Sequence, residues 1–300
     1  MGPKELTINC TVAHPCRNAL GEGPIWDWRT GVLWWVDILD SKLWRYQPST
    51  HAVTVWDAPR YPACLALHGA EQLLLTGRNW SACFSPAAGS WQDIATTGID
   101  FSRERFNDGR VDAKGRWWIG AMDRQLKSQI AGVYCLQPGW QWQRQRSGIG
   151  LGNGIGFSPD ARWMYVTDTL AKTIYRHEFD LQAGRIGPGT AWVSVTAGAG
   201  GPDGLTVDSE GFVWSAQFDR AAIHRYSPDG SLVAKIALPV RRPTSVEFGG
   251  EGLKTLFITS ASMEMSPQDL EAHPMSGNLL SIDCDVSGMP ENVLETALAL

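Results

Sequence analysis

The chain has 300 residues, of which 43% are hydrophobic and 19% are charged, and its formal net charge is −5. This composition allows a sizeable buried core and excludes a disordered chain. No run rich in lysine and arginine is present, so the sequence lacks the basic footprint of a nucleic-acid-binding protein.

The cysteines and the N-terminal residues indicate the compartment. The six cysteines are scattered and form no C-x-x-C pair, which argues against a structural zinc site. The first residues contain no apolar signal core, and no apolar run approaches transmembrane length. We therefore expect a cytoplasmic protein with reduced thiols and no membrane partner.

The predicted elements are short strands separated by turns. An alternating strand is expected first, at Leu6–His14. Six segments then begin with the same pattern, a turn followed by an apolar strand. They are Asp27–Pro48, His68–Gly77, Val111–Asp123, Ser158–Asp180, Val207–Gly230 and Phe248–Ser260. One short helical turn is expected near Ser266–Pro274, and a last strand at Gly277–Val286.

These units recur about every 42 to 50 residues, which is typical of a β-propeller. We predict an all-β, six-bladed β-propeller that forms a single domain over residues 1–300. The first and last strands would pair in one blade and leave no open sheet edge. Five or seven blades, or a β-sandwich, are the alternatives that this pattern leaves open.

Matching positions of the units carry polar side chains. They lie eight or nine residues before the turn of their unit and are Glu22, Asn107, Asn153, Asp203 and Thr244. In a propeller such positions converge on one axis. Two carboxylates that meet there would repel each other without a cation, and oxygen ligands suit Ca²⁺, Mg²⁺ or Mn²⁺ and can also hold Zn²⁺ or Fe²⁺. The sequence thus predicts one divalent cation in the central channel.

A simpler explanation exists for each motif alone, because Asn-Gly and Asp-Gly pairs form turns. Asp108 is read in that way. Asp37 and Asp168 are read as structural residues at strand ends, and Thr244 and Cys64 are placed on the channel wall. Glu22 lies between two glycines, which no turn preference explains, and the shared register of four units favours a metal site.

Five blocks carry a family resemblance: "LGEGPIWD", "RFNDGRVDAKGRWWIG", "LGNGIGFSPDARWMYVTDT", "GGPDGLTVDSEGFVW" and "RPTSVEFGG". In this order they resemble the senescence-marker-protein/gluconolactonase/luciferin-regenerating-enzyme family, which includes regucalcin and bacterial sugar lactonases. The resemblance implies a six-bladed propeller with one divalent cation in its channel. It implies metal ligation by Glu22, Asn153 and Asp203, with Asp203 also the catalytic base.

The resemblance further implies that Arg105 and Asn107 contact the substrate, and Asp123 is the polar residue at a third expected position. Relatives of the regucalcin type carry acidic residues soon after the "G-x-M" step. Here "GAMDRQLKSQ" has no glutamate at the corresponding place, so the sugar preference of those relatives does not carry over.

The expected activity is hydrolysis of an aldonolactone, of the glucono-, xylono- or arabinono-lactone type, by a monomer or weak oligomer. In one version Asp203 accepts the proton of the attacking water, and in the other it only orients a metal-bound hydroxide. The sequence leaves two further functions open. They are a metal-dependent hydrolase of aryl esters or organophosphates, and a non-catalytic, regucalcin-like calcium-binding protein. No H-E-x-x-H or G-x-S-x-G motif is present.

Overall fold

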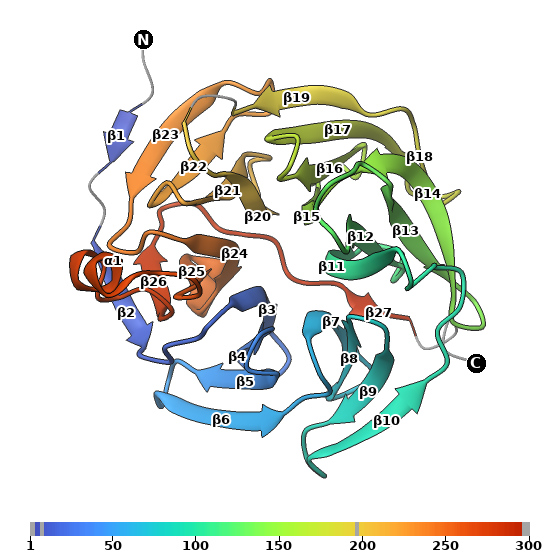
Figure 1. The fold of residues 1–300 in the computed structure, drawn as a ribbon, viewed down its shortest axis with the longest axis horizontal. Helices are drawn as coiled ribbons and strands as arrows, with labels where there is room; N and C mark the ends of the chain where they lie inside the picture. The colour runs from blue at the N-terminus through green and yellow to red at the C-terminus, as the bar shows by residue number, and fades with distance from the viewer. Residues whose placement is uncertain (1–3, 7–8, 196–197, 296–300) are drawn as a thin grey trace.

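The structure, a computed structural model, describes residues 4–6, 9–195 and 198–295. It is built almost entirely of strands, which form six sheets arranged as blades around a central axis (Figure 1). The predicted six-bladed β-propeller is therefore confirmed. Among the described residues, no helix combines the length and the apolar character needed to cross a membrane.

Each blade begins with an inner strand beside the axis and continues outward through antiparallel neighbours. The first blade is β3 (Gly21–Asp27), β4 (Val32–Asp37), β5 (Lys42–Gln47) and β6 (Ala52–Asp57). The second is β7 (Pro62–His68), β8 (Gln72–Gly77), β9 (Ser81–Ser85) and β10 (Ser90–Ile94). The third is β11 (Glu104–Val111), β12 (Trp117–Asp123), β13 (Ala131–Gln137) and β14 (Gln141–Ile149).

The other three blades follow the same plan. The fourth is β15 (Gly152–Phe157), β16 (Trp163–Asp168) and β17 (Thr173–Asp180), and β17 also pairs with β18 (Arg185–Ile186) and β19 (Thr190–Ser194). The fifth is β20 (Gly201–Val207), β21 (Val213–Phe218), β22 (Ala222–Tyr226) and β23 (Leu232–Ala237). The sixth is β24 (Pro243–Gly249), β25 (Thr255–Ser260), β26 (Leu279–Asp283) and β2 (Cys10–His14).

Both ends of the chain help to close the ring. The N-terminal strand β2 pairs with β26, as predicted, and completes the sixth blade. Two pairings were not predicted: β1 (Lys4–Leu6) runs parallel to β23, and β27 (Val293–Leu294) runs parallel to β7. The predicted helical turn is present as α1 (Pro267–Ala272), and a 3-10 turn, η1 (Glu251–Leu253), precedes β25.

The turn between the first two strands of a blade requires a left-handed residue. Gly31, Gly115 and Gly211 have φ angles of 69°, 73° and 86° at this turn. Glycine adopts such angles without steric cost. In the fourth blade Ala161 takes the same place with φ of 53°, so the repeat retains the conformation where it has lost the glycine.

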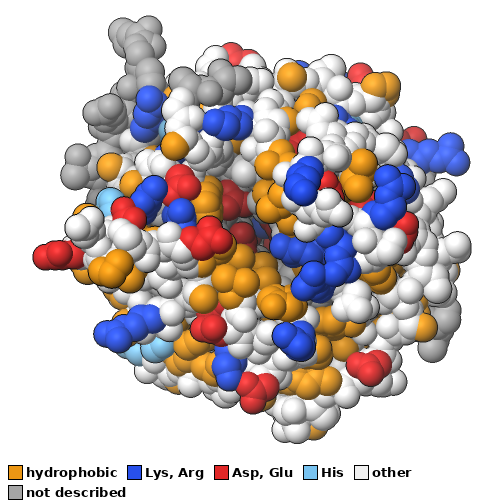
Figure 2. Space-filling view, viewed as in Figure 1, with side chains coloured by type: hydrophobic (Ala, Val, Ile, Leu, Met, Phe, Trp, Pro, Cys, Tyr) orange, Lys and Arg blue, Asp and Glu red, His pale blue; other side chains and the backbone are white. Residues whose placement is uncertain are grey.

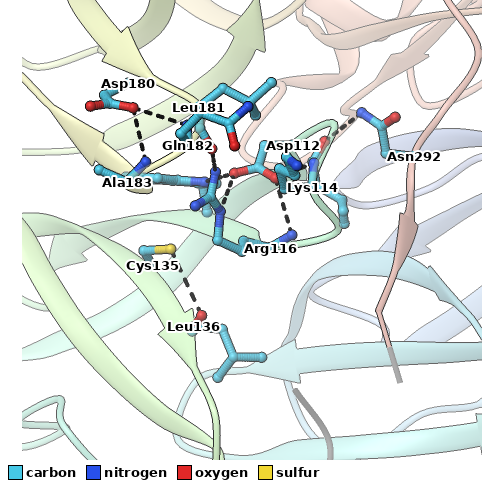
Figure 3. Close-up of polar contacts among 12 residues, drawn as sticks. Asp112, Lys114, Arg116, Cys135, Leu136, Asp180, Leu181, Gln182, Ala183 and Asn292 are labelled. Atoms are coloured by element: carbon cyan, nitrogen blue, oxygen red, sulfur yellow. Dashed lines mark hydrogen bonds and ion pairs between the residues drawn. The ribbon is translucent and has the colours of Figure 1, made fainter. Parts of the chain in front are cut away.

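We call the end of the channel where the inner strands begin its mouth, and the opposite end its base. Loops at the base tie neighbouring blades together (Figure 3). Arg116 Nε donates to Asp112 Oδ2 at 2.7 Å, and Arg116 Nη2 donates to the carbonyl of Leu181 in the next blade at 2.5 Å. The indole of Trp118 also donates to Asp112 at 2.8 Å. The buried carboxylate of Asp112 thus anchors this part of the base.

The C-terminal segment runs across the base before it reaches β27, and Figure 1 shows it passing through the middle of the ring. Its backbone is held by Ser209, whose N–H donates to Ser287 at 2.9 Å, and by Leu253, which accepts from the Gly288 N–H at 2.8 Å. Asn292 donates to the carbonyl of Val111 at 3.0 Å. The channel is therefore covered at its base by the chain's own C-terminal part.

Candidate active site

A β-bulge marks the start of every inner strand. The pairing of inner and second strand shifts between Glu22 and Ile25 in the first blade and between Pro202 and Leu205 in the fifth. The other four blades shift at the corresponding places, around residues 63, 107, 154 and 244. A bulge leaves residues unpaired and re-aims their side chains. The matching positions predicted from sequence thus coincide with a β-bulge that is repeated in every blade.

Glycines beside these bulges let neighbouring inner strands approach closely. A Cβ added to Gly204 would lie 2.7 Å from the Cα of Ser245, and one added to Gly154 would lie 2.5 Å from the backbone nitrogen of Leu205. No side chain fits at such distances. Asp203 and Asn153, which precede the two glycines, are therefore held where neighbouring inner strands pack closely.

The two predicted asparagines are linked across blades. Asn107 Nδ2 donates to the carbonyl of Gly152 at 3.0 Å and to Asn153 Oδ1 at 3.3 Å. Asn153 Nδ2 donates to the hydroxyl of Thr169 at 3.1 Å, which in turn donates to the carbonyl of Pro202 at 2.8 Å. This chain of hydrogen bonds fixes the orientation of the Asn153 amide between the third and fifth blades.

Glu22 and Asp203 are buried carboxylates that interact with each other. Burial raises the pKa of Glu22 well above its usual range, and the charges of Asp203 and Asp108 raise it further. Burial also raises the pKa of Asp203, with a further contribution from Asp108. The backbone N–H of Gly23 donates to Glu22 at 3.2 Å, whereas Oδ1 of Asp203 is buried and has no hydrogen-bond partner.

These residues fit a hard divalent cation. Asp203 raises the pKa of Glu22, Asp108 raises the pKa of both, and one Asp203 oxygen is orphaned, so a cation between the two carboxylates would stabilise them. Within the described ranges, no three His, Cys, Asp or Glu side chains are grouped so as to hold a metal ion. A cation here would therefore need the amide oxygen of Asn153 beside the two carboxylates, which is the predicted donor set.

Arg105 lies at the mouth, in β11, and is half-buried. Its Nη1 donates to the carbonyl of Phe106 at 3.3 Å and to Oδ1 of Asn107 at 3.4 Å. The positive charge of Arg105 also interacts favourably with Glu22. The structure thus places Arg105 beside Asn107, the other predicted substrate residue, and places Asn107 beside Asn153.

Asp123 has its carboxylate occupied by its own loop. It accepts the backbone N–H groups of Gln125 at 2.9 Å, Lys127 at 3.0 Å and Ser128 at 2.8 Å. These donors, Gln125 first, lower the pKa of Asp123. Asp37 and Asp168 hold backbone amides at the same strand end of their blades, the structural role expected for them. Asp123, which was expected in the substrate wall, makes the same kind of contacts with backbone amides as Asp37 and Asp168.

Sequence reasoning missed two channel residues, Asp108 and Arg110. Asp108, read as a turn residue, is buried on the channel wall in a small cavity shared with Cys64 and Ser245, and burial raises its pKa to about 6. Asp108 and Arg110 are two residues apart in β11, and side chains two apart in a strand point to the same side, which is the sequence signal that both face the axis. Thr244, which the sequence placed on the channel wall, is buried, and its hydroxyl donates to the carbonyl of Gly21 at 2.5 Å.

The base of the channel is sealed by an ion-pair network. Arg110 bonds to Glu247 at 2.6 Å and to Glu291 of the C-terminal segment. Thr206 lies within 3.4 Å of the same Glu247 oxygen. Glu291 belongs to no repeat unit, so nothing in the sequence pattern indicates its place. The arrangement leaves the mouth as the access route to Glu22 and Asp203.

The family of the chain follows from its sequence as well as this geometry. Residues 20–262 match the SMP-30/Gluconolactonase/LRE-like region. The protein belongs to this family. The family expected from the five sequence blocks is thereby confirmed, and the matched residues contain all six inner strands of the propeller.

Individual relatives resemble the chain over nearly its whole length. The 6-deoxy-6-sulfogluconolactonase of Pseudomonas putida is 34% identical and covers 95% of this chain and 97% of its own. The L-arabinolactonase of Azospirillum brasilense is 32% identical and covers 93% of each. A crystal structure of a calcium-binding protein, regucalcin, from Agrobacterium tumefaciens superimposes with a TM-score of 0.91 at 26% identity, covering 97% of this chain and 99% of its own.

Proposed function

We propose that this protein is a lactonase that uses one divalent cation to hydrolyse an aldonolactone to the aldonic acid. The observation that carries the proposal is the orphaned, buried oxygen of Asp203 beside Glu22 at the accessible end of the channel. The names of the two bacterial relatives, both sugar lactonases, support the reaction type.

Glu22, Asp203 and the amide oxygen of Asn153 would hold the cation. When bound, it would draw electron density from the lactone carbonyl and stabilise the negative charge that develops on the carbonyl oxygen. Oxygen donors select weakly among Ca²⁺, Zn²⁺, Mn²⁺, Mg²⁺ and Fe²⁺. The calcium-binding description of the regucalcin from A. tumefaciens supports testing Ca²⁺ first.

Asp203 would accept the proton of the attacking water. Burial and the charge of Asp108 raise the pKa of its carboxyl, which makes it a stronger base than an exposed aspartate. Contact with a cation opposes that effect, and in the competing version Asp203 only orients the water. Arg105 and Asn107 would bind sugar hydroxyls, where fixed donors orient the ring. Asp123 would hold the loop beside them.

A pH-indicator assay on neutral aldonolactones tests the proposal. The chelated protein is measured with glucono-, xylono- and arabinono-lactones before and after re-addition of single metals. We expect little turnover without metal and recovery with at least one ion. An Asp203→Asn protein that folds and binds metal but keeps full activity would remove Asp203 as the base.

A second function is favoured by the regucalcin comparison, namely calcium binding without catalysis. Tight Ca²⁺ binding in calorimetry, with no lactone opened under any metal, would support it and reject the lactonase. Fast hydrolysis of aryl esters or organophosphates without lactone opening would instead support the third possibility. We further propose a cytoplasmic monomer or weak oligomer, which light scattering of the purified protein and fractionation of cells would check.

A further inference from the structure

Three arginines gather at the mouth of the channel. Arg78 follows β8, Arg105 lies in β11 and Arg124 follows β12, and all three are half-buried. The N–H of Arg78 donates to the carbonyl of Tyr61, just before β7, and that of Arg124 donates to the carbonyl of Arg103, just before β11. The inner strands β7 and β11 contact each other, so the second and third blades are neighbours. Figure 2 shows lysine and arginine side chains gathered beside the central hollow.

The arginines are close enough to repel one another. Burial lowers the pKa of Arg105 to about 10, and the positive charges of Arg78 and Arg124 both contribute to the lowering. Among the residues that the structure describes, none of the three forms an ion pair with a carboxylate. Like charges brought together without a counter-charge cost free energy unless an anion joins them.

The nearby acidic groups already have other partners. Glu104 accepts from the hydroxyl of Tyr134 at 3.1 Å and is paired with Arg144. Asp123 is occupied by the amides of its loop. Glu22, which does interact with Arg105, belongs to the carboxylate pair deeper in the channel. The positive charge at the mouth is therefore left for a ligand.

The guanidinium groups are also held in place with donors to spare. Arg124 Nη1 donates to the carbonyl of Phe101 at 2.6 Å, and the guanidinium carbon of Arg78 lies 5.3 Å from the centre of the Tyr61 ring. Arg105 uses one nitrogen, Nη1, for its two long contacts. A guanidinium has five N–H donors, so most donors of Arg105 and Arg124 stay free for an anion.

We infer that the mouth binds a fixed negative charge on the substrate, so that the preferred lactone carries a sulfonate, phosphate or carboxylate remote from its lactone carbonyl. This inference rests on the proposed function, because it orients a lactone in the same site. The carbonyl end points to Glu22 and Asp203, and the anionic end contacts Arg78, Arg105 and Arg124. The positive charge at the mouth would attract the anionic end and so fix this orientation.

Matched substrates test the inference. Glucono-1,5-lactone is compared with lactones of the same ring that carry a phosphate, a sulfonate or a carboxylate at carbon 6. We expect kcat/KM to be about 10- to 100-fold higher for at least one charged lactone than for the neutral one, which is the gain that hydrogen bonds to a charged group supply. The three charged arms identify the anion that is preferred. Equal kcat/KM values for neutral and charged lactones would overturn the inference and leave the lactonase intact.

Substitutions assign the effect to the arginines. Arg78→Gln and Arg124→Gln should each lower the charged-to-neutral ratio of kcat/KM by about 10-fold. Arg103→Gln is the matched control, because Arg103 is exposed just before β11, at the same end of the channel, and is not among the charges that act on Arg105. A fall in the ratio as large for Arg103→Gln as for the other two would show only a loss of net charge and refute the site.

A binding measurement separates this inference from the reaction. Calorimetry compares 6-phosphogluconate with gluconate, which differ in the phosphate and need no turnover. We expect the phosphate to tighten binding by about 10-fold or more, and Arg124→Gln to remove that gain. If no lactone is opened but this gain is found, the proposed reaction fails and the anion site stands. If the two acids bind equally, the anion site is refuted.

Discussion

Replacing Asp203 by asparagine should stabilise the cation-free protein. Oδ1 of Asp203 is buried without a partner, and the carboxylate lies in the field of Asp108 and Glu22. A structural aspartate behaves in the opposite way. Asp168 accepts the N–H groups of Gly150 and Leu151 at 3.0 and 3.1 Å, so Asp168→Asn should be destabilising.

The magnitude follows from the hydrogen bonds. An unsatisfied buried acceptor costs about 1–3 kcal/mol, and more when it is charged. Part of the gain from Asp203→Asn is lost because the new amide donors also need partners. We expect a net stabilisation of about 1–2 kcal/mol at pH 8, or roughly 2–4 °C in Tm for a chain of this size. Asp168→Asn should cost about 1–3 kcal/mol.

The assay is thermal and urea unfolding of chelated protein, followed by the fluorescence of its 15 tryptophans. A cation at 100 times its Kd should then stabilise the wild type by about 2.7 kcal/mol and Asp203→Asn much less. The reasoning is refuted if Asp203→Asn destabilises the chelated protein as strongly as Asp168→Asn does. Asp203 would then be a structural aspartate.

The remaining predictions concern pH, the base of the channel and one turn. Burial raises the pKa of Asp108 to about 6 and those of the paired carboxylates as well, so the folded, cation-free protein holds more protons than the unfolded chain. For these groups alone, the stability of the cation-free protein should be greatest below about pH 4 and should fall as the pH rises through about 6. The stabilisation by added Ca²⁺ should grow over the same interval. A Ca²⁺ stabilisation that does not change with pH would contradict this reasoning. Glu291→Gln removes one of the two carboxylates bonded to Arg110 and should cost about 1–3 kcal/mol in urea unfolding, with the unchanged m-value as the check on compactness. Ala161→Gly should gain up to about 1 kcal/mol, because φ is 53° there; a loss in urea unfolding would show that the left-handed conformation carries no strain.

Several parts of the molecule were predictable because they depend on local pattern. Alternating apolar residues recur in each unit, most units have a turn glycine such as Gly31 or Gly211, and a repeat of about 42 to 50 residues leaves few folds other than a propeller. The shared register of Glu22 and Asp203 follows from the same repeat. A symmetric ring converts equal positions along the chain into equal positions around an axis.

Other parts were decided only when the blades packed together. The link from Asn107 to Asn153 and the arginines at the mouth bring residues of different blades together. Burial by the packed blades also leaves one oxygen of Asp203 without a partner. Asp108 reads as a turn former in isolation, but the bulge before it directs its carboxylate to the channel wall. The closure of the base by Glu291 belongs to no repeat at all.

The sequence by itself therefore determined the fold, the family and the register of the polar ring, because backbone pairing and strand alternation are short-range and repeat with the chain. Tertiary structure alone decided which of these side chains share one space, how each carboxyl's pKa is displaced and where charge stays unpaired. Burial and Coulomb interactions depend on distances through space, and residues far apart along the chain, such as Arg110 and Glu291, set them.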